Sequence, residues 1–143
     1  MTAALLDDHL LRDLLAGSMP DALGDVLASH TPATTNYYLY RLCRSVAAAA
    51  GGALTGTWAP ERRLALARQL VELPAEVDVV PMRLLAFRMA ELAAAHRVST
   101  LGAEAAAAAE HLGAPLVVWS GDDGPGIRAA VTAVGAGYLT VAR

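Results

Sequence analysis

The segment 116–141 constrains the fold of this chain most, because it reads as a strand, a helix and a second strand in close succession. Leu116–Trp119 is a short apolar run, Pro125 opens a helical pattern that ends before Gly135, and Tyr138–Val141 is the second apolar run. Two strands that a helix of this length joins lie parallel in one sheet. The segment therefore predicts an α/β fold with helices packed on a parallel sheet.

Apolar patterns over the rest of the chain predict the other elements. Ala3–Leu6 and residues 76–80 read as strands, and residues 53–58 as a loop or a short extended piece. His30-Thr31-Pro32 reads as a helix break, after which Thr34 or Thr35 offers an N-cap. Gly51-Gly52 ends the helix that follows this cap. Helices are expected over about residues 10–16, 21–29, 36–50, 60–73, 82–96 and 101–112.

Length and composition favour one cytoplasmic domain over residues 1–143. No apolar run approaches the roughly 20 residues that cross a bilayer, and the N-terminus lacks the basic region of a signal peptide. The single cysteine excludes an internal disulfide. All eleven basic residues are arginine, and the net charge is −3. This balance argues against a strong non-specific grip on nucleic acid and leaves a local arginine patch open.

Carboxylates follow two of the expected strands. Asp7, Asp8 and His9 come directly after Ala3–Leu6, and Asp122 with Asp123 comes shortly after the strand that ends at Trp119. Ligands of open α/β sheets bind at the carboxyl ends of the strands. If the two strands are neighbours, the four carboxylates converge there and offer the hard oxygens that Mg²⁺ prefers. His9 suits a softer ion such as Zn²⁺ or Mn²⁺.

Three stretches resemble the PIN-domain family, whose members include Mg²⁺-dependent nucleases of bacterial toxins. Leu5–Gly17 resembles the family's opening strand, first acid and first helix, and Val98–Val117 its third acidic motif, alanine-rich helix and next strand. Gly121–Asp123 and Gly135–Leu139 resemble its last acidic turn and final strand. The resemblance implies a three-layer PIN-like α/β domain with a short parallel sheet flanked by helices.

The sequence departs from the family pattern at two of four acidic positions. The first acid maps onto Asp7, and the fourth onto Asp122 or Asp123. The second is expected within 36–40, where no acid stands. The third maps onto Gly102, and Glu104 comes two residues later, about 200° around a helix. The expected metal ligands are Asp7, Asp122, Asp123 and Glu104.

Simpler structural roles stand beside these site roles. Asp7 or Asp8 caps the first helix, Asp122 and Asp123 form a turn before Pro125, and Glu104 interacts with a helix dipole. His9 is then a solvated neighbour of the cap.

Two arginines and two tyrosines on the helix 36–50 form a candidate RNA surface. Arg41 and Arg44 suit a phosphate, and Tyr37 and Tyr40 suit stacked bases of a single strand. The simpler alternative is an arginine pair on a solvated or acid-paired face. In a site that has lost acids, an inward arginine also replaces the charge of a metal.

These observations favour a degenerate PIN-like module that binds RNA or a protein without cutting. The alternative is a Mg²⁺- or Mn²⁺-dependent ribonuclease in which Asp7, Asp8, Asp122 and Asp123 hold the metal and a bound water attacks the phosphodiester. The expected partners are RNA, a small antitoxin-like protein or a second copy of the chain, and no membrane. A flavodoxin-like receiver is a third interpretation, but the lysine that it expects after Leu116–Trp119 is absent.

Overall fold

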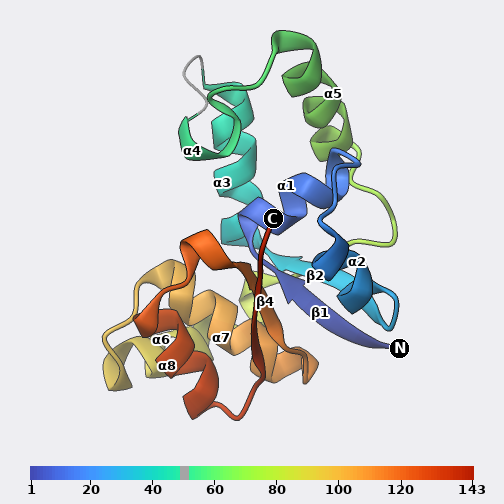
Figure 1. Cartoon of the computed structure of the whole chain (residues 1–143). Coiled ribbons are helices and arrows are strands. Elements are labelled where there is room, and N and C mark those ends of the chain that lie inside the picture. Colours follow the sequence, from blue (N-terminus) through green and yellow to red (C-terminus); the bar gives the residue numbers. More distant parts are fainter. Residues whose placement is uncertain (49–51) are drawn as a thin grey trace.

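The computed structural model describes residues 1–48 and 52–143, which form a five-stranded parallel sheet flanked by helices (Figure 1). The strand order is β3-β2-β1-β4-β5, and every neighbouring pair is parallel. The α/β class and the parallel sheet predicted from the sequence are confirmed. The strands are β1 (Thr2–Leu6), β2 (His30–Thr35), β3 (Asp78–Val80), β4 (Leu116–Trp119) and β5 (Tyr138–Val141).

Helices connect every pair of consecutive strands. α1 (Asp8–Leu15) and α2 (Asp21–Leu27) follow β1, and α8 (Pro125–Ala133) joins β4 to β5. Short 3₁₀ turns cover Met82–Leu84 and Ser120–Asp122. The remaining helices are α3 (Asn36–Ala47), α4 (Gly52–Thr55), α5 (Pro60–Val71), α6 (Ala86–Ala95) and α7 (Thr100–Leu112).

Alternating side chains of the central strands build a core on each face of the sheet. Leu5 of β1 packs with α6, α7 and α8, whereas Ala4 and Leu6 pack with α1 and α2 on the other face. Residues 103–109 of α7 are buried and mostly alanine, so this helix approaches the sheet closely. The helices that cover the two faces are the outer layers of the predicted three-layer architecture, and the sheet is the middle layer. A third core joins α1 to α3, α4 and α5, which extend beyond the carboxyl ends of the strands (Figure 1).

The helix before His30-Thr31-Pro32 ends at Leu27, as the predicted break requires, but these residues also begin β2, which the sequence did not predict. Pro32 has no N–H and therefore fits only where one side of a strand is unpaired. It pairs with Ala4 of β1, but pairing with β3 starts one residue later, at Ala33. β2 is mostly polar and contains no apolar run, so its sequence does not indicate a strand.

Several element boundaries also differ from those expected. The strand expected over 76–80 covers only Asp78–Val80, and 53–58 is not a loop throughout because α4 occupies Gly52–Thr55. The expected helix 82–96 begins with a separate 3₁₀ turn. α3 ends at Ala47, since Ala48 is already extended. The expected end of that helix at residues 49–51 lies outside the described residues.

The expected N-cap of α3 is present, and a glycine ends α7. Thr35 caps α3 by accepting a hydrogen bond from Tyr38 N–H, and Gly113 ends α7 in the left-handed conformation. Within residues 1–48 and 52–143, none of the helices is both long enough and apolar enough to cross a membrane.

Candidate functional site

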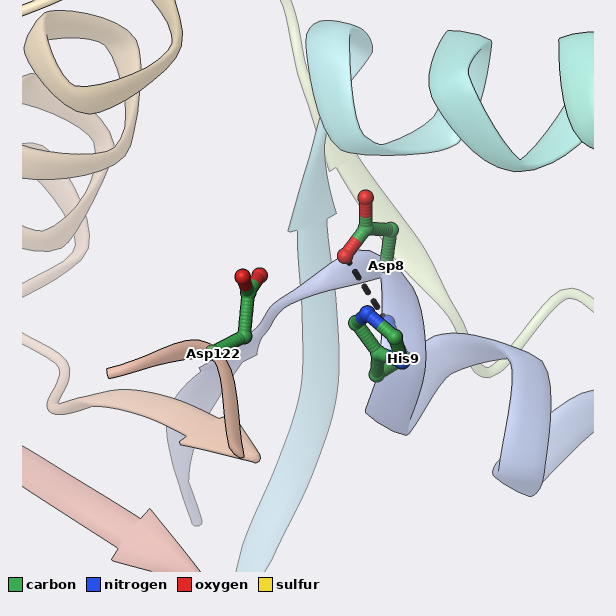
Figure 2. Close-up of side chains that lie close together, drawn as sticks. All are labelled: Asp8, His9 and Asp122. Carbon is green, nitrogen blue, oxygen red and sulfur yellow. Dashed lines mark hydrogen bonds between the residues drawn. The ribbon is translucent and has the colours of Figure 1, made fainter. Parts of the chain in front are cut away.

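The candidate site lies at the carboxyl ends of β1 and β4. The two strands are direct neighbours, with Leu5 beside Leu116 and Leu6 beside Val117. Asp8 and His9 start α1 after β1, and Asp122 belongs to the turn after β4. One ligand atom from each of these three residues lies within 4.8 Å of the other two. Figure 2 shows the carboxylates and the ring facing a common space.

Asp7 joins the two strand ends rather than facing this space. It is 1% exposed, and its Oδ1 accepts a hydrogen bond from Leu10 N–H at 2.8 Å, which caps α1. Its Oδ2 accepts a second bond from Trp119 N–H at 2.9 Å, which ties α1 to the end of β4. Burial raises the pKa of Asp7 to about 7, although both backbone bonds lower it. The expected metal ligand thus has both oxygens engaged by the backbone.

Asp8 has a buried carboxylate oxygen, Oδ2, that accepts no hydrogen bond among the described residues. Its side chain is fully buried, and Oδ1 accepts a hydrogen bond from His9 N–H, the dashed line in Figure 2. Among the described residues, Oδ2 has no hydrogen-bond partner, and Arg41 Nε lies 3.4 Å from it in an ion pair. Burial raises the pKa of Asp8, and Arg41 counteracts this effect. The cation that faces Asp8 is therefore an arginine.

His9 is neutral, with a tautomer that its neighbour sets. Its Nδ1 lies 2.9 Å from Nη2 of Arg143, and a guanidinium only donates hydrogen bonds. Nδ1 is therefore the acceptor, and the ring proton is on Nε2. Burial, followed by the charge of Arg143, lowers the pKa of His9 to about 4. The ring also packs against Trp119, with 4.6 Å between centroids.

This donor set fits a metal ion poorly. Asp8 and Asp122 offer suitable oxygens, and the Oδ2 atom of Asp8 lacks a hydrogen bond. A metal on Nε2 of His9, however, requires the proton to move to Nδ1, where it would face Arg143. Arg41 already neutralises Asp8. His9 Nε2–H and the neighbouring Arg41 and Arg143 could donate to an anion, whereas the carboxylates of Asp8 and Asp122 would repel it.

The two other expected acids lie outside the group of three. Asp123 is bound at the surface, where its carboxylate accepts hydrogen bonds from Arg128 Nη2 and Tyr138 O–H, both at 2.7 Å. These bonds lower the pKa of Asp123. Glu104 is fully buried, and its Oε1 accepts a hydrogen bond from Tyr37 N–H at 2.9 Å. Glu104 therefore points away from solvent and stabilises the first turn of α3.

Close packing excludes a side chain at Gly102, where the resemblance expects the third acid. A Cβ there would lie 2.3 Å from Cγ2 of Val98 and 2.9 Å from Cγ1 of Ile127. Glu104 instead brings a carboxylate to the start of α3, the segment where the second acid is expected and missing. This replacement crosses between helices, so spacing along the sequence does not reveal it.

The arginines predicted to contact RNA line a pocket of about 270 Å³ at the end of α3. Arg41 and Arg44 share this pocket with His9 and Leu54. Arg41 thus stands between the pocket and Asp8. Tyr37 and Tyr40 are exposed on α3 but do not line the pocket.

Sequence reasoning missed Arg12, which belongs to α1, and Arg143, which contacts α1. Arg143 donates to His9 and to Asp13, and its guanidinium lies 4.2 Å from the ring centroid of Trp119. Figure 1 shows the C-terminal end of the chain against α1. The helical spacing between Asp8 and Arg12 was a usable signal for Arg12. No local pattern pointed to Arg143, which is separated from His9 by most of the chain.

The fold and site define an α/β protein in which the inward strand-end acid, Asp8, is paired with Arg41. No protein-family model matches the chain, and a search of curated proteins found no significant match.

Proposed function

We propose that this protein is a PIN-like domain that binds single-stranded RNA without cutting it. The observation that carries the proposal is the position of Arg41, which pairs with Asp8 and lines the same pocket as Arg44 and His9. An arginine supplies the positive charge of a metal but does not generate a nucleophilic water. Such a site attracts a phosphate and lacks the means to hydrolyse it.

The pocket offers several hydrogen-bond donors to a phosphate. The ion pair engages Nε of Arg41, and among the described residues its two terminal nitrogens have no hydrogen bond. Arg44 adds a second guanidinium, and His9 adds the Nε2–H that its bond to Arg143 enforces. Guanidinium groups bind phosphate oxygens in pairs and remain charged at every physiological pH.

Tyrosines on the same helix suit the bases of the bound strand. Tyr37 is one helical turn before Arg41, and Tyr40 is one turn before Arg44, so each ring lies on the same side of α3 as one arginine. Tyr40 is 59% exposed. An exposed ring beside a phosphate site stacks bases with little regard to sequence.

Fluorescence anisotropy with a labelled oligouridylate tests this function. Arg44→Gln should weaken binding about tenfold at low salt, because each lost phosphate contact costs roughly that much. Arg68→Gln is the matched control, since Arg68 lies on α5 outside the pocket. The oligomer should remain intact during incubation with Mg²⁺ or Mn²⁺. Equal affinities for the two variants and the unchanged protein would contradict the proposal.

The second candidate function is a Mg²⁺- or Mn²⁺-dependent ribonuclease, which the Oδ2 atom of Asp8 favours because it is buried without a hydrogen bond. Asp8 and Asp122 would be its central ligands. Cleavage of the oligomer that requires the metal, and that Asp8→Asn abolishes, would establish this function instead. The antitoxin-like partner and the homodimer implied by the resemblance stay predictions, and light scattering coupled to gel filtration tests the second.

A further inference from the structure

We propose that a second pocket, between α1 and α5, binds a neighbouring phosphate of the same RNA strand. This inference rests on the RNA binding proposed above. The pocket has a volume of about 300 Å³ and has no lining residue in common with the pocket of Arg41 and Arg44. Its polar and aromatic lining consists of Arg12, Asp13, Ser18, Trp58, Arg62 and Arg143.

Positive charge exceeds negative charge in this second pocket. Arg12 donates to Oδ1 of Asp13 through Nε and Nη2, and Arg143 donates to Oδ2 of the same carboxylate. The single carboxylate of Asp13 therefore accepts hydrogen bonds from both Arg12 and Arg143. Among the described residues, no carboxylate forms an ion pair with Arg62, whose Nη2 donates to Ser18 Oγ at 3.3 Å. The lining therefore has three guanidinium groups and one carboxylate, which favours an anion.

The neighbouring Trp58 holds Arg62 ready for a ligand. The guanidinium carbon of Arg62 lies 3.6 Å from the centroid of the Trp58 ring. Stacking of this kind orients the planar group while its edge nitrogens keep their capacity to donate. The ring is only half-buried, so the stacked pair borders solvent. A phosphate entering the pocket thus meets a guanidinium that has already lost part of its freedom.

The two pockets are connected through α1. His9, in the wall of the first pocket, accepts a hydrogen bond from Arg143 in the wall of the second. Arg12, in the second, donates to the backbone oxygen of Leu54, which lines the first. His9 and Asp13 are four residues apart, which is about 6 Å along a helix. This short connection is the basis for placing successive phosphates of one nucleic-acid strand in the two pockets.

The distribution of arginine supports a continuous phosphate path. Five of the eleven arginines in this acidic chain line the two pockets. They come from α1, α3, α5 and the C-terminal residue, so the fold gathers them from distant parts of the sequence. Because the protein has a net charge of −3, these clustered arginines favour an anionic ligand that is long enough to extend along them.

Salt-dependent binding of oligouridylates of different lengths tests the second pocket. Arg62→Gln should weaken binding of an eight-residue oligouridylate about three- to tenfold and reduce the slope of log K against log salt by about 0.7, the contribution of one phosphate in a single strand. It should leave uridine monophosphate binding unchanged. Arg62→Lys should retain the slope, because it retains the charge. Arg68→Gln, on the same helix but outside the pocket, should behave like the unchanged protein.

The outcomes separate this inference from the proposed function. If Arg44→Gln weakens binding and Arg62→Gln behaves like Arg68→Gln, the second phosphate site is wrong while RNA binding stands. If Arg62→Gln weakens the monophosphate as much as the oligomer, the two pockets are a single site and the inference also fails. If the unchanged protein binds no oligomer, both proposals fail. Thermal melting of each variant establishes that the substitution leaves the fold intact.

Discussion

Two pairs of consecutive aspartates, Asp7-Asp8 and Asp122-Asp123, follow neighbouring strands and meet different fates. In each pair one carboxylate faces the site and the other holds the structure. Asp8 and Asp122 share a space with His9, whereas Asp7 binds two backbone N–H groups and Asp123 binds Arg128 and Tyr138 at the surface. Residue type alone therefore does not distinguish a candidate ligand from a helix cap. The direction in which each side chain points makes the distinction.

Burial explains why the two structural aspartates differ electrostatically. Asp7 is enclosed, so loss of hydration raises its pKa to about 7 despite two hydrogen bonds. Asp123 stays in water, so its bonds to Arg128 and Tyr138 lower its pKa. Ionisation of an aspartate therefore costs stability at the buried position of Asp7 and is favoured at the exposed position of Asp123.

The largest expected effect is that of Asp7→Ala. The substitution removes the cap of α1 and the acceptor for Trp119 N–H, leaving two backbone donors without a partner in a largely buried region. A loss of about 3 kcal/mol in the free energy of unfolding is expected near pH 4, where Asp7 is protonated, measured by urea denaturation. Asp123→Ala is the matched control at the surface. A loss no greater than that of the control would show that Asp7 does not connect the strand ends.

Asp7 also predicts a dependence of stability on pH. Its pKa is about 7 in the folded state and 3.8 as its ordinary value, so between these values the folded state holds more protons. The Asp7 contribution to stability is therefore fully present below pH 4 and is lost as the pH rises to about 7. Denaturation of the protein and of Asp7→Asn across this range should show the difference between them shrink toward pH 7. A constant difference would contradict the raised pKa.

Arg41→Gln probes the inward carboxylate of the first pair. The substitution removes the cation of Asp8, and because Arg41 is partly exposed to water it should cost only about 1 kcal/mol of stability. It should also tighten Mn²⁺ binding about tenfold, because Asp8 and Asp122 no longer share their space with a guanidinium charge. Titration calorimetry measures this affinity. Arg44→Gln, which has no carboxylate partner among the described residues, should leave Mn²⁺ affinity unchanged, and equal effects of the two variants would refute a specific role for Arg41.

The smallest expected effect is that of Asp123→Asn. Its ion pair with Arg128 is exposed to water and therefore contributes little. Urea denaturation should show almost no change, and RNA affinity should be retained because Asp123 lies outside both arginine pockets. Asp122→Asn is the informative neighbour, since it removes an acid beside the first pocket and should strengthen RNA binding slightly. Reversed results would exchange the roles assigned to the two residues.

Local patterns were sufficient for most of the fold. The apolar runs of β1 and β4 are largely buried strands, and that of β5 is an edge strand in which only Val141 is buried. Thr35 and Pro125 lie at the helix ends where they were expected. These features depend on residues close together in the chain. β2 escaped detection because its threonines and Pro32 lack an apolar pattern and derive their strand conformation from pairing with β1 and β3.

The candidate site was predictable in part. The sequence by itself determined which acids stand at strand ends, and that Arg41 and Arg44 lie one turn apart on a helix. Only the tertiary structure decided that Arg41 faces Asp8, that Glu104 holds the start of α3 and that Arg143 sets the tautomer of His9. These contacts join residues that are far apart in the chain, and they depend on the order of the strands and the packing of helices beside them. Periodicity carries no information on such contacts, because it describes only the neighbours of a residue on its own element.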